Sequence, residues 1–460
     1  MRPSLDLLCW ETRRLFRTGT ATVALGLLAF GGLVALWSAD REIARHREEI
    51  ARLPDFYAAQ MQRLAGQFAD GGHAGYVAYY AFFPTWDPPP ALAGLSVGLR
   101  DLLPAAVWVR LLGLEAQLYE SGLGNPGLQS LGPFDLAFVV CALAPLVLLL
   151  LTHDLLTRDR ERGVLPLAHV QSGGLGRLFA ARLLVRAGAV AAVCTGLFVI
   201  AVSWHRIPMD GAALAWLGDA LLHLLVWTAF AAVVAAACGS TGASLAAAGT
   251  VWLGAVVVLP AALNLGLTAA FPVPEGLELT VRQRQETHAG WDRPKEETFA
   301  RFFAAYPEWR DTPPVTGRFA WKWYYALQHG GDAAVAASAR TYAANLRARA
   351  AAAERLAWLV PPVGAQLLLS RRAGTDLEAH LEFLERVRAF HEALKHYFHP
   401  LIFAEAELKP AAWSAFPRYQ PPAPAGSAGS WLERLPLAAA ALGPSLAALV
   451  LVRRTSALPS

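Results

Sequence analysis

The chain contains six apolar stretches, each long enough to cross a lipid bilayer as a helix. A hydrocarbon core of about 30 Å needs about 20 helical residues, because an α-helix rises about 1.5 Å per residue. Backbone amides in lipid must find hydrogen-bond partners within their own segment, which favours helices. The six predicted spans cover residues 20–37, 134–151, 184–203, 217–238, 243–265 and 435–452.

Three of these stretches contain a proline, at Pro145, Pro260 and Pro444. Neighbouring helices in a bundle usually satisfy the carbonyl groups that such prolines release. Pro260 lies close to the end of its stretch, so we predict that it ends the fifth span.

Positive charge separates the segments between the spans into two groups. Lys and Arg near the ends of spans stay on the cytoplasmic side of a membrane. Segments 1–17, 152–186 and 453–460 hold twelve arginines against five acidic residues. With six spans these three segments fall on one side, so we expect both termini and the 152–186 loop to be cytoplasmic. Residues 39–133 and 267–434 then lie outside.

The predicted fold class is all-α, a polytopic six-helix transmembrane protein with a mainly helical extracytoplasmic domain. The predicted order of segments is a cytoplasmic amphipathic helix (1–17), transmembrane helix 1 (18–38), extracytoplasmic region 1 (39–133), transmembrane helix 2 (134–152), a cytoplasmic loop (153–183), transmembrane helices 3–5 (184–266), extracytoplasmic region 2 (267–434), transmembrane helix 6 (435–452) and a cytoplasmic tail (453–460).

The two outer regions show helical patterns and no convincing alternation of strand type. Region 1 begins with Ile43, Ile50 and Leu53 at helical spacing, so the first span is expected to continue outward as a rod. In region 2 we predict one helix over 338–359, stopped by Pro361, and another over 376–398, stopped by Pro400. Since each region follows a span, we expect the two regions to pack on each other.

Motifs for catalysis are missing from the sequence or only partly formed. It has no Gly-x-x-x-x-Gly-Lys-Ser/Thr loop for phosphate and no Gly-x-Ser-x-Gly elbow. His391 and His396 are five residues apart, and a zinc-protease helix needs a spacing of four. His396 and His399, with His380 or Glu392, remain a weaker alternative for a metal site. A hydrolase is therefore the least favoured reading.

Charge gives little support to carrier or nucleic-acid functions. The spans contain almost no charged residues, which argues against a proton path. Asp135 and Asp219 lie near span ends, and we expect their side chains to reach the membrane interface. The formal net charge of +4 is too small to indicate a nucleic-acid partner.

The loop between the second and third spans carries the most informative pattern. It reads Arg158-Asp-Arg-Glu-Arg-Gly-Val-Leu165, followed by Leu167 and Val170. The helix of the second span is predicted to continue to Arg162 and to end at Gly163. A generic basic loop accounts for the arginines, but it leaves the order Glu-Arg-Gly-Val-Leu unexplained.

With this loop the chain resembles a type-2 ATP-binding cassette (ABC) transporter permease. That family has six spans, an amphipathic N-terminal helix, and a second-to-third-span loop with an Asp, then Glu-Arg/Lys-x-Gly-Thr-Leu, then a short coupling helix. Asp154 and the run Arg160–Leu165 stand at the matching positions, with one residue fewer before Gly163 and Val164 in place of Thr. The stretch from Pro361 to Phe383 resembles the outer domain of an uncharacterised branch of the family.

The resemblance implies a transport subunit that is not itself an enzyme. It binds no cofactor, because ATP and Mg would be bound by a separate ATPase subunit. The implied partners are that ATPase, a second permease subunit and membrane lipid, in a bacterial inner (plasma) membrane, with export as the usual direction. The implied ATPase contact comprises Arg158, Asp159, Glu161, Arg162 and Gly163, and Glu161→Lys is expected to disrupt it.

An alternative function remains open on the sequence. The chain could be a membrane-anchored extracytoplasmic sensor or scaffold that transports nothing. Six spans are more than an anchor requires, so we rank this second. Recovery of an ATPase partner would distinguish the two.

Overall fold

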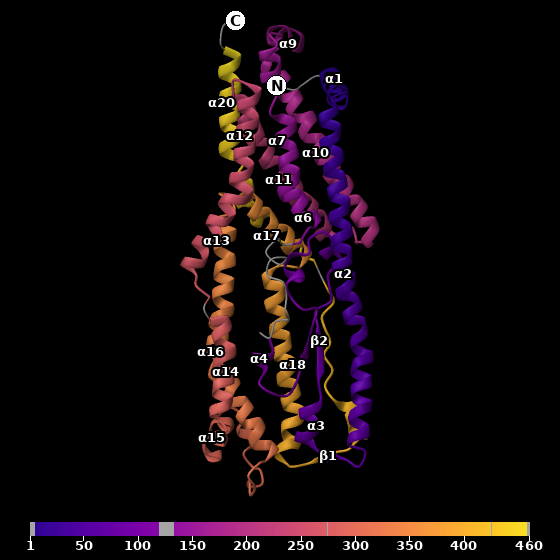
Figure 1. Cartoon of the computed structure of the whole chain (residues 1–460), viewed down its shortest axis with the longest axis vertical. Helices are drawn as coiled ribbons and strands as arrows, with labels where there is room; N and C mark the ends of the chain where they lie inside the picture. Colours follow the sequence, from indigo (N-terminus) through magenta and orange to yellow (C-terminus); the bar gives the residue numbers. More distant parts are fainter. Residues whose placement is uncertain (1–4, 119–132, 274, 425, 458–460) are drawn as a thin grey trace.

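The protein is an elongated, mostly helical molecule (Figure 1). The computed structural model describes residues 5–118, 133–273, 275–424 and 426–457. Apolar helices form one end of the molecule, and helices of mixed polarity with a few short strands form the other. The helix α2 (Gly19–Gln67) runs along most of the length and joins the two ends. The helix α1 (Leu5–Phe16) and the last turns of α20 (Leu442–Ala457) lie at the same end.

Five helices in the described part of the chain are long and apolar enough to cross a membrane. A sixth span is present if one bent pair of helices counts as a single crossing. The chain is therefore an all-α membrane protein, and its described part holds five or six apolar helices long enough to cross a membrane. The five segments are Gly19–Gln67, Leu136–Glu161, Leu175–His205, Gly211–Ala237 and Thr241–Ala270, and the bent pair is Trp431–Ala439 with Leu442–Arg453.

Two of these segments contain a π-helical turn just before a proline. In the second segment a five-residue π turn ends two residues before Pro145, and in the fifth a similar turn ends two residues before Pro260. A proline ring collides with the carbonyl of the preceding turn, and a widened turn relieves that collision. The prediction that Pro260 ends the fifth span is therefore wrong, because the helix continues to Ala270.

Side chains from neighbouring helices bond to the widened turns. Trp252 donates its indole N–H to the carbonyl of Ala142 at 2.8 Å, which links the fifth segment to the π turn of the second. The helical pieces concerned are α6 (Leu136–Phe138), η3 (Val139–Leu143), α7 (Ala144–Thr152), α12 (Thr241–Leu253), η4 (Gly254–Val258) and α13 (Leu259–Ala270).

The predicted sixth span is not one straight helix. It consists of η7 (Trp431–Arg434), α19 (Leu435–Ala439) and α20, and the axis bends by 42° at the break before Leu442. Pro444 lies in the first turn of α20, where backbone N–H groups have no partner within the helix, so its missing N–H costs no helical hydrogen bond. The chain thus places its break where this proline can be accommodated.

The end opposite the apolar helices, which we call the outer end, is built in the described part of the chain mainly from seven helices. Three predicted helix bounds are wrong. The helix predicted over 338–359 is α16, which begins at Trp321 and ends at Arg355. Pro400, predicted to stop the next helix, lies inside α18. Bounds of these helices are α3 (Ala74–Tyr80), α4 (Leu114–Leu118), α14 (Glu275–Ala289), α15 (Lys295–Ala305), α16 (Trp321–Arg355), α17 (Pro361–Ala373) and α18 (Leu377–Phe403).

Packing explains why two of these helices extend beyond their predicted limits. Trp323 and Tyr325, in the first turns of α16, are buried in the outer core. The last turn of α18, beyond Pro400, places Ile402 and Phe403 in the same core. Burial of such side chains contributes about 1.5–3 kcal/mol each, enough to offset one lost helical hydrogen bond.

The two outer regions pack on each other, as predicted from their positions in the chain. Strand β1 (Gly72–His73) from region 1 pairs antiparallel with β4 (Glu407–Leu408) from region 2. Phe83 of region 1 lies in one core cluster with Phe302 and Phe398 of region 2. The remaining short elements are β2 (Phe83–Trp86), β3 (Ala106–Val109), η1 (Ala91–Gly94), η2 (Gly98–Asp101), η5 (Pro307–Trp309) and η6 (Pro410–Ala415), with β2 pairing antiparallel to β3.

Buried ion pairs join the outer domain to the spans through α17. Arg372 of α17 and Asp219 of α11 (Gly211–Ala237) are both 0% exposed, and Arg372 Nε lies 2.8 Å from Asp219 Oδ2. Arg372 Nη1 also lies 2.6 Å from Glu433, and Arg434 pairs with Asp219. We call Asp219, Arg372, Glu433 and Arg434 the outer ion cluster. It holds together α11, α17 and the start of the last apolar segment.

Asp135 and Asp219 are both fully buried within the protein, whereas the sequence predicts that their side chains reach the membrane interface. Asp135 is fully buried, and it accepts hydrogen bonds from the amides of Phe138 and Val97, each at 2.8 Å. Both carboxylates bond within the protein because loops and helices of the outer domain cover the ends of the spans. Hydropathy alone does not show that another part of the chain packs over the ends of the spans.

Asp332 of α16 is expected to make the stability of the outer domain depend on pH. Its carboxyl accepts hydrogen bonds from the Leu114 amide at 2.6 Å and the Glu115 amide at 3.2 Å. Burial raises the pKa of Asp332 from its usual value of 3.8 to about 6, so the folded chain holds this proton more tightly than the unfolded chain. Its contribution to stability therefore falls as pH rises from about 4 to about 6, by up to about 3 kcal/mol.

The Asp332→Asn variant isolates this effect, because asparagine does not titrate. The free energy of unfolding of both proteins is measured in urea between pH 4 and 7. The buried histidines of the outer domain titrate in both proteins, so they cancel in the difference. A difference that stays constant across this range would contradict the prediction.

Candidate functional site

The loop between the second and third apolar segments forms two short helices at one end of the molecule (Figure 1). They are α8 (Thr157–Glu161) and α9 (Leu165–Ser172), and α10 (Leu175–His205) follows directly. Gly163 has φ +68° and Gly173 has φ +72°, in the left-handed region that favours glycine. These two glycines end the preceding helices and set α9 apart from α8 and α10.

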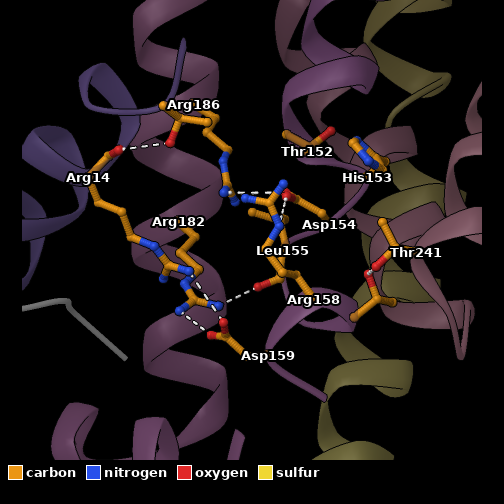
Figure 2. Close-up of polar contacts among 12 residues, drawn as sticks. Arg14, Thr152, His153, Asp154, Leu155, Arg158, Asp159, Arg182, Arg186 and Thr241 are labelled. Atoms are coloured by element: carbon orange, nitrogen blue, oxygen red, sulfur yellow. Dashed lines mark hydrogen bonds and ion pairs between the residues drawn. The ribbon is translucent and has the colours of Figure 1, made fainter. Parts of the chain in front are cut away.

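A buried arginine holds α8 against α1 and α10. Arg182 of α10 is 3% exposed, and its Nε donates to Glu11 of α1 at 2.9 Å. Its Nη2 donates to Asp159 of α8 at 2.5 Å, and its Nη1 donates to the carbonyl of Leu155 at 2.5 Å (Figure 2). Arg14 of α1 adds a second bond to Asp159 at 3.3 Å. One guanidinium thus joins three helical elements that are far apart in sequence.

A second carboxylate of this region, that of Asp154, is shared by two arginines. Asp154 Oδ2 lies 3.1 Å from Arg158 Nε, and Asp154 Oδ1 lies 3.4 Å from Arg186 Nη2 (Figure 2). We call Glu11, Arg14, Asp154, Arg158, Asp159, Arg182 and Arg186 the inner ion cluster. Charge-assisted hydrogen bonds of this kind are stronger than neutral ones, so the cluster fixes α8 relative to the spans.

The end of α8 is bonded to the link between α11 and α12. Glu161 accepts from the amide of Thr241 at 2.6 Å and from its hydroxyl at 2.8 Å. Arg160 donates to the carbonyls of Cys238 at 3.2 Å and Gly239 at 3.4 Å. The carboxylate of Glu161 therefore satisfies an amide in the first turn of α12, a group that has no partner within its own helix.

Removal of this contact is expected to loosen the start of α12. In Glu161→Ala the Thr241 amide loses its acceptor, so we expect faster hydrogen–deuterium exchange there, measured by mass spectrometry of a peptide covering 239–246. Arg162→Ala, one residue away and exposed, serves as the matched control and should leave that peptide unchanged. Equal exchange in the parent chain and Glu161→Ala would show that the contact contributes nothing.

Apolar side chains of α9 and its entry are exposed. Leu167 is 59% exposed and Val170 is 75% exposed, and Val164 before the helix is also exposed. Only Ser172 in α9 is buried. An apolar surface on a short helix that projects from the bundle is typical of a contact for another protein.

The five residues predicted at the ATPase contact do not form one exposed patch. Arg162 and Gly163 are exposed, and Arg158 is partly exposed and paired with Asp154. Asp159 is buried and bonds within the chain, and Glu161 is exposed but bonded to Thr241. The substitution Glu161→Lys would consequently disturb the link to α12, so it is not a clean test of partner binding.

Sequence reasoning missed several residues that shape this site. Arg182 and Arg186 were assigned only to charge that orients the chain, although each belongs to the inner ion cluster. They lie on either side of the predicted start of the third span at residue 184, and ionisable residues beside a span usually have a specific partner. The role of Glu11 could not be predicted, because its partner Arg182 lies 171 residues away in the sequence.

No three His, Cys, Asp or Glu side chains come together in the described ranges in a way that could hold a metal ion. A family model described as Domain of unknown function (DUF3526) matches residues 277–422. The match covers α14 to the segment after η6, and it does not include α8 or α9. No curated protein and no solved structure matches the chain.

Proposed function

We propose that the chain is the permease subunit of an ATP-binding cassette transporter, with α9 as the helix that contacts a separate ATPase subunit. The exposed apolar surface of Leu167 and Val170 carries this proposal, because it lies directly after the Glu-Arg-Gly-Val-Leu order that resembles the family motif. In this proposal both termini and α9 are cytoplasmic, and the outer domain faces the other side of the membrane. Six crossings follow if the bent last segment is a span.

The contacts around α8 support a mechanical role for the site. Displacement of α9 by an ATPase would pull on α8, and α8 bonds to α1 through Asp159, to α10 through Arg182 and to α12 through Glu161. A movement at one helix would thus reach three elements of the span bundle together. In the proposed mechanism, ATP binding and hydrolysis take place on the partner, and this chain converts closure of the ATPases into tilting of its spans, with export as the direction.

Substitution of Val170 by aspartate is expected to weaken ATPase binding by about thirtyfold, since a charge in a desolvated contact costs 2 kcal/mol or more. The side chain of Val170 is exposed and does not belong to the core, so membrane insertion should be unaffected. The measurement is the affinity of the full chain, in detergent, for a candidate ATP-binding subunit from the same genome.

The matched control is Val281→Asp on α14, which places the same substitution at an exposed valine of the outer domain. This control should bind the ATPase like the parent chain. If Val170→Asp binds equally well, α9 is not the contact. If the parent chain itself recovers no ATPase, the sensor or scaffold reading replaces the transporter.

A further inference from the structure

A cavity of about 470 Å³ lies beside the inner ion cluster, between α1, the start of α2, α7 and α10. Its wall has two parts with different chemistry. One part is apolar and comes from segments long enough to cross a membrane, and the other is charged and lies where those segments end. The apolar part includes Val23, Leu27, Leu150 and Val185, and the charged part includes Glu11, Arg14, Asp154, Arg158, Arg182 and Arg186.

The charged part of this cavity carries an excess of positive charge. Four arginines and two carboxylates line it, and Asp159, just outside the lining, pairs with Arg14 and Arg182, which leaves a formal excess of one. Asp154 is shared by Arg158 and Arg186, so neither guanidinium has a carboxylate of its own. Figure 2 shows both arginines directed toward Asp154 from different elements. An additional anion would complete the pairing.

One hydrogen-bond donor in this cluster is buried without an acceptor. Arg186 Nη1 has no partner in the part of the chain that the structure describes, although its surface is covered. Buried polar groups almost always have a partner, so a donor of this kind needs an explanation. Arg186 lines the cavity, and a ligand oxygen there would supply the acceptor.

We propose that this cavity binds one anionic phospholipid, with the phosphate at Arg158 and Arg186 and an acyl chain along the apolar wall. Basic pockets between spans on the cytoplasmic side of a membrane suit anionic headgroups. Free phosphate would satisfy the arginines but would leave the apolar wall without a partner. The proposal requires that the apolar segments cross the membrane with α8 at the cytoplasmic end, and it does not depend on the transporter function.

A lipid at this position would contact the residues that hold α8. Arg158 belongs to α8, and Arg14 and Arg182 bond to Asp159 of the same helix. The bound phosphate would neutralise the excess charge around α8 and fix its orientation. The position of α9, which three residues separate from α8, would then depend on the lipid composition of the membrane.

The test measures lipid binding to the full chain by native mass spectrometry from detergent, with thermal unfolding as a second readout. The probes are dioleoylphosphatidylglycerol, dioleoylphosphatidylcholine and inorganic phosphate. We expect one tightly bound phosphatidylglycerol that raises the unfolding temperature, and little effect from the other two. Equal binding of both lipids, or equal stabilisation by phosphate alone, would overturn the proposal.

Two variants examine the two parts of the cavity separately. Arg158→Gln should weaken phosphatidylglycerol binding about fivefold, the effect of roughly one basic residue near a membrane surface. Its control is Arg162→Gln, an exposed arginine of the same loop that does not line the cavity. Leu150→Trp should block the apolar wall, whereas Leu146→Trp, one turn away on the same helix and outside the lining, should not. Unchanged binding in both Arg158→Gln and Leu150→Trp would also overturn the assignment.

Discussion

Arg182→Met is expected to lower the free energy of unfolding by about 3–5 kcal/mol, the cost of breaking a buried ion pair by removing one partner. Arg182 is almost fully buried and bonds to Glu11, Asp159 and the carbonyl of Leu155. Methionine fills a similar apolar volume but offers no donor. Glu11 would then retain only Arg14, at 3.6 Å, and that arginine would have to serve Asp159 as well.

Chemical unfolding in one detergent, followed by circular dichroism, measures this loss. Arg162→Met is the matched control, because it replaces an exposed arginine of the same region and should change stability by no more than about 0.5 kcal/mol. Arg182→Lys keeps the charge without the planar fork and should fall between the parent and Arg182→Met. If Arg182→Met and Arg162→Met unfold alike, the inner ion cluster does not hold the bundle together.

Arg372→Met should destabilise the chain by a similar amount, about 3–5 kcal/mol, from the opposite end of the spans. Arg372 and Asp219 are both fully buried, and Arg372 also reaches Glu433. Asp219 would retain Arg434, but Glu433 would lose its pair. Because α17 lies between α11 and the outer domain, we also expect the outer domain to become more sensitive to protease in this variant.

A double-mutant cycle with Asp219→Leu separates the pair from its surroundings. The two substitutions together should cost less than the sum of the single effects, because the double variant leaves neither charge of the pair buried alone. Arg371→Met is the control, since Arg371 is the adjacent residue and pairs with Glu354 at a partly exposed position. Its effect should stay below about 1 kcal/mol. Additive single effects would show that Arg372 and Asp219 do not stabilise each other.

The two ion clusters lie toward opposite ends of the span bundle. The inner cluster joins α1, α8 and α10, and the outer cluster joins α11, α17 and the start of the last apolar segment. Between them the described spans meet through apolar side chains and a few bonds such as that of Trp252 to Ala142. A guanidinium with several charged acceptors holds the elements that it joins in a fixed relative position. We therefore expect each cluster to restrict relative motion of the helices that it joins.

The positions of the apolar segments could be predicted from the sequence, because hydropathy is a property of each residue and is summed over consecutive positions. The extension of the first span into a rod was also readable, since α2 continues to Gln67 through charged residues at helical spacing. The end of the charged helix before Gly163 was also predicted, although a turn at residues 153–156 separates α7 from α8, so the predicted helix is not continuous. Each of these features depends on neighbours within a few turns of the same helix.

Tertiary structure alone decided which charges are buried and which residues they meet. Asp219 looked like an interfacial residue, and it is instead a fully buried partner of Arg372, 153 residues later. Asp159 looked like part of an exposed contact, and Arg182 holds it inside. An ion pair depends on distance in space, and nothing in the local pattern of an acidic residue specifies a partner so far along the chain. The exposed surface of α9 likewise exists because Gly163 and Gly173 turn it away from a core that could have covered it.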